Sequence, residues 1–265
     1  MCGIAGYSLG NGSGVDRTLA AQALLAGIAE RGADAVGYAY RAGATVSVHK
    51  QRTGASSLLD CMALPAATDG VLVHVRDYTK GHPSILANNH PIRHGNVVGI
   101  HNGIVANDDE LFARHGLERA EPEMTVDSEA IFALVDELGT SPETLEQLVG
   151  VIAAAWADER EPGVLHLARG IGRPLWIARG RHEVLFASTR SALEVAEQAL
   201  RTTFLKSQVD EGRLLTLAEG TVAATQRWTP DSSFREDGSL PAVRAPHEGR
   251  SCLALLSALV APASA

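Results

Sequence analysis

A cysteine at position 2 is the feature of this sequence with the clearest chemistry. Removal of Met1 would leave Cys2 as the N-terminal residue, with a nucleophilic thiol and a basic α-amine on the same residue. A thiol titrates near ~8.5 and an α-amine near ~7.7–8.0, so the amine can accept the thiol proton at neutral pH while sulfur attacks a carbonyl carbon. Gly3 and Gly6 leave room for a substrate carbonyl or other backbone to approach. The alternative interpretation is a core strand over residues 2–7 with a buried thiol, because free cysteine is among the most buried residue types.

Four short motifs follow Cys2 in the chain, and a single aspartate follows them. The motifs are Arg-Gly-Ala-Asp-Ala-Val-Gly at 31–37, His-Val-Arg-Asp-Tyr-Thr-Lys-Gly at 74–81, Asn-Asn-His-Pro at 88–91 and His-Asn-Gly-Ile-Val-Ala-Asn at 101–107, and the aspartate is Asp127. With the opening Cys-Gly-Ile, this ordered set resembles the class II glutamine amidotransferases, which are N-terminal-nucleophile (Ntn) hydrolases. The resemblance extends over about residues 1–220 and is strongest in the first half.

The resemblance implies an enzyme that hydrolyses the side-chain amide of glutamine through a γ-glutamyl thioester on Cys2, with release of ammonia. Arg76 would then bind the substrate carboxylate in a bidentate manner, and Asp127 would bind the substrate ammonium. Attack by sulfur creates an oxyanion, for which the Asn102 amide and the Gly103 backbone N–H are the candidate donors. The alternatives are an Ntn hydrolase of another amide and a catalytically idle binding module of the same fold. Arg76 together with Asp127 favours a free α-amino acid as substrate.

The histidines divide between the substrate site and the scaffold. The resemblance places His90, together with Thr79, in the substrate site and makes His74 and His101 structural. A metal site is the other interpretation of so many histidines, but none of them forms a His-Glu-x-x-His helix motif, and the three cysteines form no Cys-x-x-Cys pair. Gly-Ile-Gly at 170–172 is too short for a dinucleotide loop and predicts a turn between strands. We therefore expect neither a metal nor a cofactor.

The loop after Arg76 departs from the pattern of the relatives. Asp77 and Tyr78 stand where relatives often carry Trp or Tyr-Pro, and Ala35 stands where many have Ser. We therefore expect the loop over bound glutamine to be built differently, with Tyr78 as its aromatic lid. The rival interpretation is that Asp77 pairs with Arg76 and weakens substrate binding.

Asn102 and Gly103 also have a structural interpretation. The dipeptide Asn-Gly is a strong signal for a type I′ hairpin, here between strands at 97–101 and 104–105. The structural and catalytic interpretations can hold together. Arg76 in isolation would be a solvated surface charge, but it follows the apolar run 70–73, which places it at a strand end where site residues are commonly displayed.

Composition restricts the class of protein. A chain of 265 residues with 45% apolar content can bury a sizeable core, in one large domain or two. A net charge of −8 argues against direct nucleic-acid binding. Three scattered cysteines and an N-terminus without a signal sequence indicate a reducing compartment, so we expect a cytoplasmic protein. The apolar segment at 252–260 is far shorter than the ~20 residues that span a bilayer, so no membrane insertion is expected.

The pattern of elements is mixed. It predicts helices at 18–30, 127–138, 142–148 and 189–200, and strands at 37–40, 45–50, 149–156, 163–168, 174–178 and 183–187. The resemblance implies an α+β fold, the four-layer αββα sandwich of two antiparallel sheets found in Ntn hydrolases. Asp127 would lie in the first turn of its helix, where the helix dipole would hold its carboxylate ionised.

The predicted glutamine amidotransferase domain covers residues 1–225, and residues 226–265 form a linker and a short apolar C-terminal segment. Residues 228–247 are rich in Pro, Ser, Gly and charge and predict a linker or strap, followed by a docking helix at 252–260 on the chain's own domain or on a partner. Little sequence remains for a second active site, so we expect ammonia to go to an acceptor activated by a synthetase or transferase partner. A standalone glutaminase and a homo-oligomer formed through the tail are the alternatives.

Overall fold

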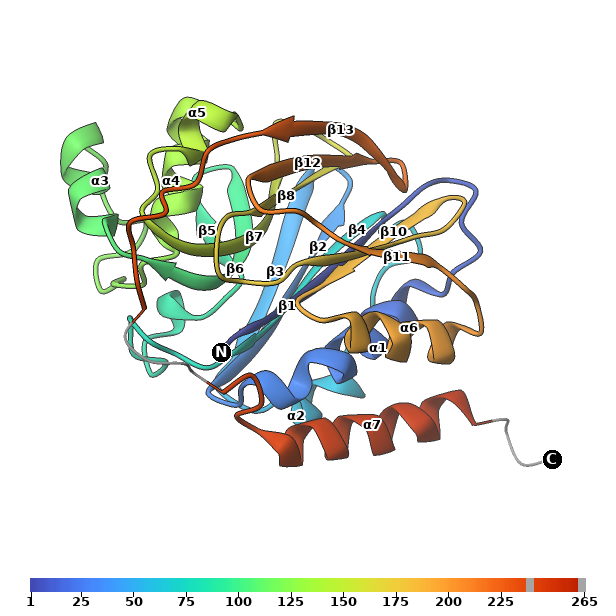
Figure 1. Cartoon of the computed structure of the whole chain (residues 1–265). Coiled ribbons are helices and arrows are strands. Elements are labelled where there is room, and N and C mark those ends of the chain that lie inside the picture. Colours follow the sequence, from blue (N-terminus) through green and yellow to red (C-terminus); the bar gives the residue numbers. More distant parts are fainter. Residues whose placement is uncertain (237–240, 262–265) are drawn as a thin grey trace.

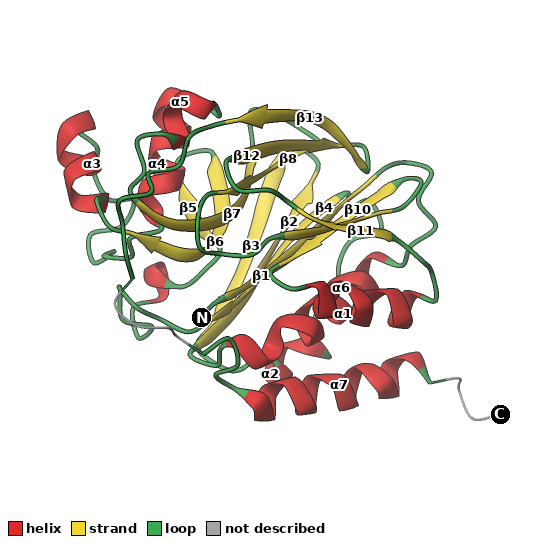
Figure 2. Cartoon of the chain, viewed as in Figure 1, coloured by secondary structure: helices red, strands yellow, loops and turns green. Residues whose placement is uncertain are grey.

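The computed structural model describes residues 1–236 and 241–261 and contains two antiparallel sheets that face each other (Figures 1 and 2). Within these residues the first sheet has the strand order β11-β9-β10-β1-β4-β2-β3. Its strands are β1 (Gly3–Leu9), β2 (Ala35–Ala42), β3 (Thr45–Gln51), β4 (Gly70–Arg76), β9 (Trp176–Arg179), β10 (Glu183–Ala187) and β11 (Leu205–Gln208).

The second sheet has the order β13-β12-β8-β7-β6-β5. Its strands are β5 (Ile92–His94), β6 (Val97–Val105), β7 (Gly150–Asp158), β8 (Val164–Arg169), β12 (Arg213–Ala218) and β13 (Thr221–Arg227). Helices cover the outer face of each sheet, which confirms the predicted αββα sandwich (Figure 1). Those beside the first sheet are α1 (Arg17–Ile28), the 3₁₀ turn η1 (Ala29–Arg31), α2 (Ser56–Leu59) and α6 (Arg190–Leu200), and those beside the second are α3 (Asp108–His115), α4 (Glu129–Leu138) and α5 (Pro142–Leu145).

Within the described ranges, apolar side chains form three cores, one for each interface between layers. Strand β1 is buried along its whole length because it contributes to two of them. Ile4 points into the core between the two sheets, whereas Ala5 and Tyr7 point into the core between the first sheet and the helices. This alternation is the period of two expected of a strand that is covered on both faces. The start of β1, and with it Cys2, is therefore fixed by packing on both sides.

Helix α1 begins and packs as its composition dictates. The Asp16 side chain caps it by accepting a hydrogen bond from the Leu19 N–H at 2.8 Å. Small side chains let α6 approach closely, since a Cβ built on Gly27 would lie 2.6 Å from the Cα of Ala192. The predicted helix at 18–30 is thus present, with its last turn tightened into η1.

The hairpin predicted at Asn102 and Gly103 is wrong. β6 runs without interruption from Val97 to Val105 and pairs with β7 over its full length, with Gly103 opposite Ile152. A long partner strand outweighs the local turn signal of the dipeptide. By contrast, the turn predicted at 170–172 is present between β8 and β9.

The C-terminal part of the chain adds a layer to the sandwich. Residues 228–236 and 241–245 contain no helix or strand, as predicted, while 237–240 lie outside the described residues. Helix α7 (Pro246–Val260) packs outside α1, η1 and α2 of its own domain (Figure 1). Cys252 and Leu256 are buried in this contact, whereas Leu253 and Leu259 are exposed. Among the helices in the described ranges, none has the length and apolar character needed to cross a bilayer.

Candidate active site

Pairing of β1 with β4 brings Cys2 beside Arg76. The antiparallel register sets Gly3 opposite Val75, so one step further along each strand sets Cys2 opposite Arg76. The Cys2 Sγ lies 3.4 Å from the Asp77 carbonyl oxygen and 3.5 Å from the Asp77 nitrogen. The nucleophile predicted from the sequence and the predicted carboxylate-binding arginine therefore lie at the same end of the first sheet.

The Cys2 thiol is held in its protonated form. Burial raises its pKa above the ordinary value, although the Asp77 N–H and the positive charge of Arg76 act in the opposite direction. A protonated thiol needs a base to become a nucleophile. While Met1 is present, the N-terminal ammonium belongs to Met1 and pairs with the Asp77 carboxylate. The Cys2 carbonyl accepts a hydrogen bond from Arg31 Nε at 2.8 Å, which fixes the backbone of the nucleophile.

Arg76 is buried, and its guanidinium is held by its own chain. It donates hydrogen bonds to the Asn89 side-chain oxygen and to the carbonyl oxygens of Lys80, at 2.9 Å, and Gly81. Asn89 is itself fixed, because its amide nitrogen donates to the Pro83 carbonyl at 2.9 Å. A guanidinium has five N–H donors, so a substrate carboxylate would use those that remain or replace the two carbonyl oxygens.

Asn102 lies near the middle of β6, which contacts both β1 and β4 across the interface between the sheets. The preceding residue is fixed from two sides: the His101 carbonyl interacts with His74 Nε2 at 3.1 Å, and His101 Nδ1 interacts with the Ser128 hydroxyl at 2.8 Å. The side chain of Asn102 is 1% exposed, and its Nδ2 has no hydrogen-bond partner among the described residues. A buried amide donor without a partner is what a site for a developing oxyanion requires.

Gly103 cannot be replaced by a residue with a side chain at this place. Its φ is +155°, and a Cβ would lie 1.8 Å from the Val151 carbonyl oxygen and 2.6 Å from His101 Nε2. The close approach of β7, not a turn, thus explains the glycine. His74 and His101 are structural, as predicted, because their hydrogen bonds hold β4, β6 and the start of α4 together.

Asp127 lies just before α4, which begins at Glu129, rather than inside its first turn as predicted. Its Oδ2 accepts a hydrogen bond from the Val105 N–H at 2.7 Å. Burial raises the pKa of its carboxyl to about 6, so desolvation outweighs the predicted effect of the helix dipole, although the group is still mostly ionised at neutral pH. The carboxylate is present above about pH 6, where it can bind an ammonium group.

Tyr78, Thr79 and His90 occupy different environments. His90 is buried, stacks on His74 with ring centroids 4.2 Å apart, and is kept neutral because burial lowers its pKa well below the usual value. Tyr78 is 43% exposed and contacts His82 edge to face, with centroids 5.4 Å apart. Thr79 is exposed. The substrate-binding roles of these three residues stay predictions.

Asp77 does not pair with Arg76, and the rival interpretation of the loop is therefore not supported by the ion pairs. Its carboxylate pairs with the Met1 ammonium through Oδ2 and with Arg244 through Oδ1, at 3.3 Å to Nε. The backbone N–H groups of Arg244 and Ala245 both donate to the Glu30 carbonyl, at 2.9 and 2.8 Å. The ion pair of Arg244 with Asp77 was not predicted from the sequence, because Arg244 lies in a segment without periodicity.

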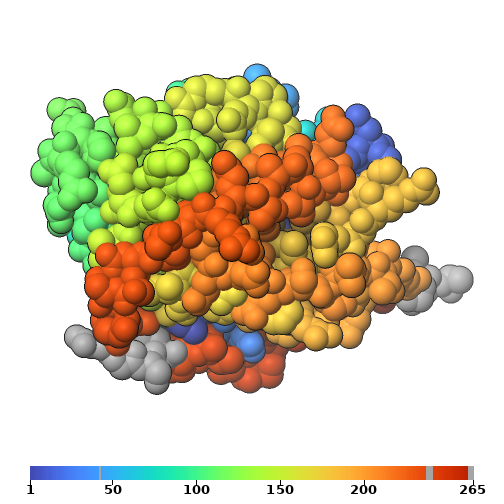
Figure 3. Space-filling model, turned by 45° about the horizontal axis from the view of Figure 1, so that its top comes forward, coloured from blue at the N-terminus to red at the C-terminus, as the bar shows by residue number. Residues whose placement is uncertain are grey.

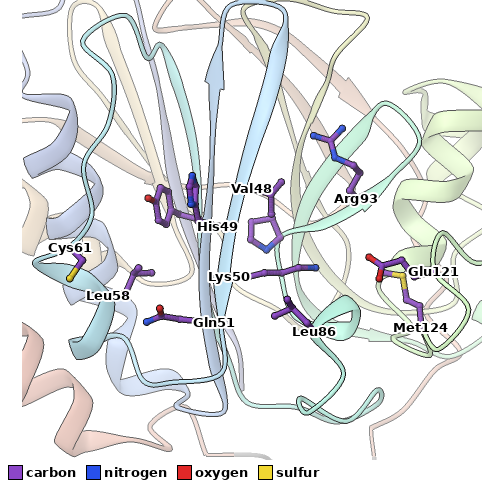
Figure 4. A pocket seen from close by; sticks show the side chains of 12 residues that line it. Val48, His49, Lys50, Gln51, Leu58, Cys61, Leu86, Arg93, Glu121 and Met124 are labelled. Atoms are coloured by element: carbon purple, nitrogen blue, oxygen red, sulfur yellow. The ribbon is translucent and has the colours of Figure 1, made fainter.

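A cavity of about 610 Å³ adjoins the site without including it (Figure 4). It lies beside β3, and Figure 4 shows Lys50 projecting into it between β3 and Leu86. Lys50 Nζ donates to the Asn89 carbonyl at 3.0 Å, so the cavity shares a wall with the segment that holds Arg76. None of the predicted site residues is among those lining it, which are Tyr38, Val48, His49, Lys50, Gln51, Leu58, Cys61, Leu86, Pro91, Arg93, Glu121 and Met124.

Comparison with known proteins agrees with this geometry. Residues 80–195 match the family model described as a glutamine amidotransferase domain. The chain is 32% identical over 202 residues to glutamine–fructose-6-phosphate aminotransferase (isomerizing) of Bradyrhizobium diazoefficiens, covering 73% of this chain and 32% of that protein. The protein of the same name from Chlorobaculum tepidum is 31% identical over 227 residues, covering 77% of this chain and 34% of that protein. The chain belongs to the class II glutamine amidotransferases. This family hydrolyses glutamine.

The fold gives the same result. Glutamine phosphoribosylpyrophosphate amidotransferase of B. subtilis, solved with ADP and GMP, superimposes with a TM-score of 0.68 at 19% identity, over 87% of this chain and 50% of that one. At this identity the likeness concerns the fold, and it confirms the Ntn-hydrolase sandwich. The chain spans about one third of the length of the curated relatives it matches. The matched part therefore corresponds to a glutamine amidotransferase domain and not to the whole of those proteins.

Proposed function

We propose that this chain catalyses the glutaminase half-reaction with Cys2 as the nucleophile. The observation that carries the proposal is the meeting of Cys2 and Arg76 at the paired ends of β1 and β4. A thiol beside a buried guanidinium suits a substrate that has both a carboxylate to be held and a carbonyl carbon to be attacked. Asp127 supplies the negative charge for the ammonium of the same substrate.

The reaction proceeds in two stages after Met1 is removed. The Cys2 amine takes the thiol proton, and sulfur attacks the side-chain carbonyl carbon of glutamine to form a tetrahedral oxyanion. The Asn102 amide and the Gly103 N–H donate to that oxyanion. Collapse breaks the carbon–nitrogen bond, the ammonium returns the proton to the leaving nitrogen, and ammonia departs. Water then attacks the γ-glutamyl thioester, which releases glutamate and the thiol.

We propose further that the ammonia serves an acceptor bound outside these 265 residues, on a further domain or on a partner protein. The names of the relatives support this, since both the fructose-6-phosphate aminotransferases and the phosphoribosylpyrophosphate amidotransferase transfer nitrogen to an acceptor. A reduced Cys2 is required for the chemistry, which supports a cytoplasmic location. We place the end of the catalytic domain near residue 225, because β13 ends at Arg227.

The test combines mass spectrometry of the N-terminus with a glutaminase assay. Wild type, Cys2→Ala and Cys61→Ala are compared for glutamate formation from glutamine. Cys61 is an exposed thiol that lines the neighbouring cavity, so its variant controls for the loss of any cysteine. We expect an N-terminal Cys2, activity in wild type and Cys61→Ala, and none in Cys2→Ala. Retention of Met1 together with no glutamate formation would refute the proposal.

A further inference from the structure

Asp77 connects the beginning of the chain to the C-terminal strap, the name used here for residues 228–236 and 241–245. One carboxylate oxygen pairs with the N-terminal ammonium, and the other pairs with Arg244 of the segment that precedes α7. The backbone of the same residue contacts the Cys2 thiol through both its N–H and its carbonyl.

Removal of Met1 would place the new N-terminal amine one residue further along β1, still beside Asp77. The register that sets Gly3 opposite Val75 sets Met1 opposite Asp77. Loss of Met1 moves the amine by one residue, and successive Cα atoms are about 3.8 Å apart. The new amine belongs to Cys2, whose Sγ already lies 3.4 Å from the Asp77 carbonyl.

We propose that Asp77 is a positioning residue that holds the α-amine of Cys2 beside its own thiol, and that Arg244 offsets part of the Asp77 charge so that the amine can release its proton near neutral pH. The inference rests on the proposed function, in which that amine is the base. A carboxylate without a partner would hold the amine as an ammonium, and an ammonium cannot accept the thiol proton. The positive charge of Arg244 thus keeps the amine available as the base.

Other charged groups surround the amine and are unchanged by substitution of Asp77 or Arg244. Arg31 donates to the Cys2 carbonyl from η1, and Arg76 lies opposite Cys2 at the end of β4. Both are positive and lower the pKa of a neighbouring amine. The titratable groups that act on these two arginines are Cys2, Glu30, Asp34, Asp77, Tyr78, Asp127 and Arg173, and Asp77 is the one among them that the variants substitute. With this background constant, Asp77 and Arg244 should change the basicity of the amine in opposite directions.

The strap gives Arg244 a defined position although its side chain is half exposed. The Glu30 carbonyl accepts from the N–H groups of Arg244 and Ala245, and further along Glu248 accepts from the Ser56 N–H at 2.8 Å. Figure 3 shows the preceding part of the strap, in orange-red, lying on the surface of the domain, where Glu236 pairs with Arg173. The C-terminal segment therefore contributes to the active site through Arg244.

The experiment measures how the reactivity of Cys2 depends on pH in chains shown by mass spectrometry to begin at Cys2. Wild type, Asp77→Asn, Arg244→Gln and the control Glu248→Gln are alkylated with iodoacetamide, and the N-terminal peptide is quantified separately from the exposed Cys61. The kcat/KM for glutamine is measured over the same pH range. We expect the midpoint of both profiles to fall by about one pH unit in Asp77→Asn and to rise by up to about one unit in Arg244→Gln. Glu248→Gln loosens α7 without touching Asp77 and should leave the midpoint in place.

The outcomes separate this inference from the proposed function. Equal midpoints in all four proteins, or shifts of the same sign in the Asp77 and Arg244 variants, would overturn the positioning role even where glutamine is hydrolysed. If the alkylation midpoints of the Asp77 and Arg244 variants shift in opposite directions but wild type does not hydrolyse glutamine, the positioning role is supported and the proposed function is refuted. Far-UV circular dichroism checks that each variant is folded. Should Asp77→Asn fail to fold, the direction of the midpoint shift in Arg244→Gln, whose side chain is half exposed, tests the positioning role.

Discussion

Substitution of Asn102 by alanine tests the oxyanion role with the least disturbance of the resting protein. The Nδ2 of Asn102 has no hydrogen-bond partner among residues 1–236 and 241–261, so its removal breaks no bond from that atom. The donor acts only when negative charge develops on the substrate carbonyl oxygen. The variant should therefore lose transition-state stabilisation while the ground state changes little.

The magnitude follows from other sites in which one such donor has been removed. A loss of 10²–10³ in kcat corresponds to about 2.7–4 kcal/mol. KM for glutamine should change less than about threefold, because Arg76 and Asp127, which hold the α-carboxylate and α-ammonium in the proposed function, are retained. The free energy of unfolding should fall by only about 1–2 kcal/mol, the cost of the small cavity left in a buried strand.

The assay is steady-state glutamate formation together with urea unfolding. Asn89→Ala is the matched control, because Asn89 is also a buried asparagine but uses both ends of its amide, on Arg76 and on the Pro83 carbonyl. It should raise KM and lower stability more than Asn102→Ala does. The reasoning is refuted if Asn102→Ala keeps kcat within tenfold of wild type, or if its loss lies entirely in KM.

Four further outcomes are expected. The binding of glutamine should strengthen as pH rises through about 6, the pKa to which burial raises Asp127, and KM measured against pH in Asp127→Asn should lose this dependence. The folded protein binds that proton more tightly than the unfolded chain does, so the Asp127 carboxylate lowers the free energy of unfolding as pH rises from about 4 to 6. At pH 7 the free energy of unfolding of Asp127→Asn should therefore exceed that of wild type by on the order of 1–3 kcal/mol, seen as a higher urea midpoint. Equal midpoints would contradict this. Gly103→Ala should lower stability by about 3 kcal/mol or more and prevent accumulation of folded protein, since its Cβ would clash with the Val151 carbonyl; a thermal melt like that of wild type would contradict it. Glu248→Ala should cost about 1–3 kcal/mol in urea unfolding because it leaves the Ser56 N–H unpaired, whereas Arg250→Ala, on the same helix, should have no measurable effect.

The candidate members of the site could be predicted from the sequence, but their pairing could not. Motif order predicted Cys2, Arg76 and Asn102, and the apolar run before Arg76 predicted its position at a strand end. That Cys2 lies opposite Arg76 depends on the register of β1 against β4, which is set by tertiary packing on both faces of β1. The contact between Asp77 and Arg244 joins segments 167 residues apart and leaves no local pattern.

Two predictions from the sequence differ from the structure for the same physical reason. At Asn102 and Gly103 a local turn signal was outweighed by the nine-residue partner strand, and at Asp127 the helix dipole was outweighed by burial. In both cases the local effect is worth about 1 kcal/mol, whereas pairing along a strand and desolvation of a charge are worth several. The apolar pattern at 252–260 likewise predicted a helix but could not specify that α1 and η1 would cover it.

In the proposed function, the turn after Asp77 lies beside the guanidinium that would bind the glutamine carboxylate. The carbonyl oxygens of Lys80 and Gly81 accept hydrogen bonds from the guanidinium, in the positions that a substrate carboxylate would use. The same turn is fixed from outside, since Lys80 Nζ lies 2.7 Å from Asp108 Oδ2. A carboxylate bound by Arg76 would therefore use the N–H donors that remain, or it would replace these two carbonyls while the Lys80 side chain stays anchored on Asp108.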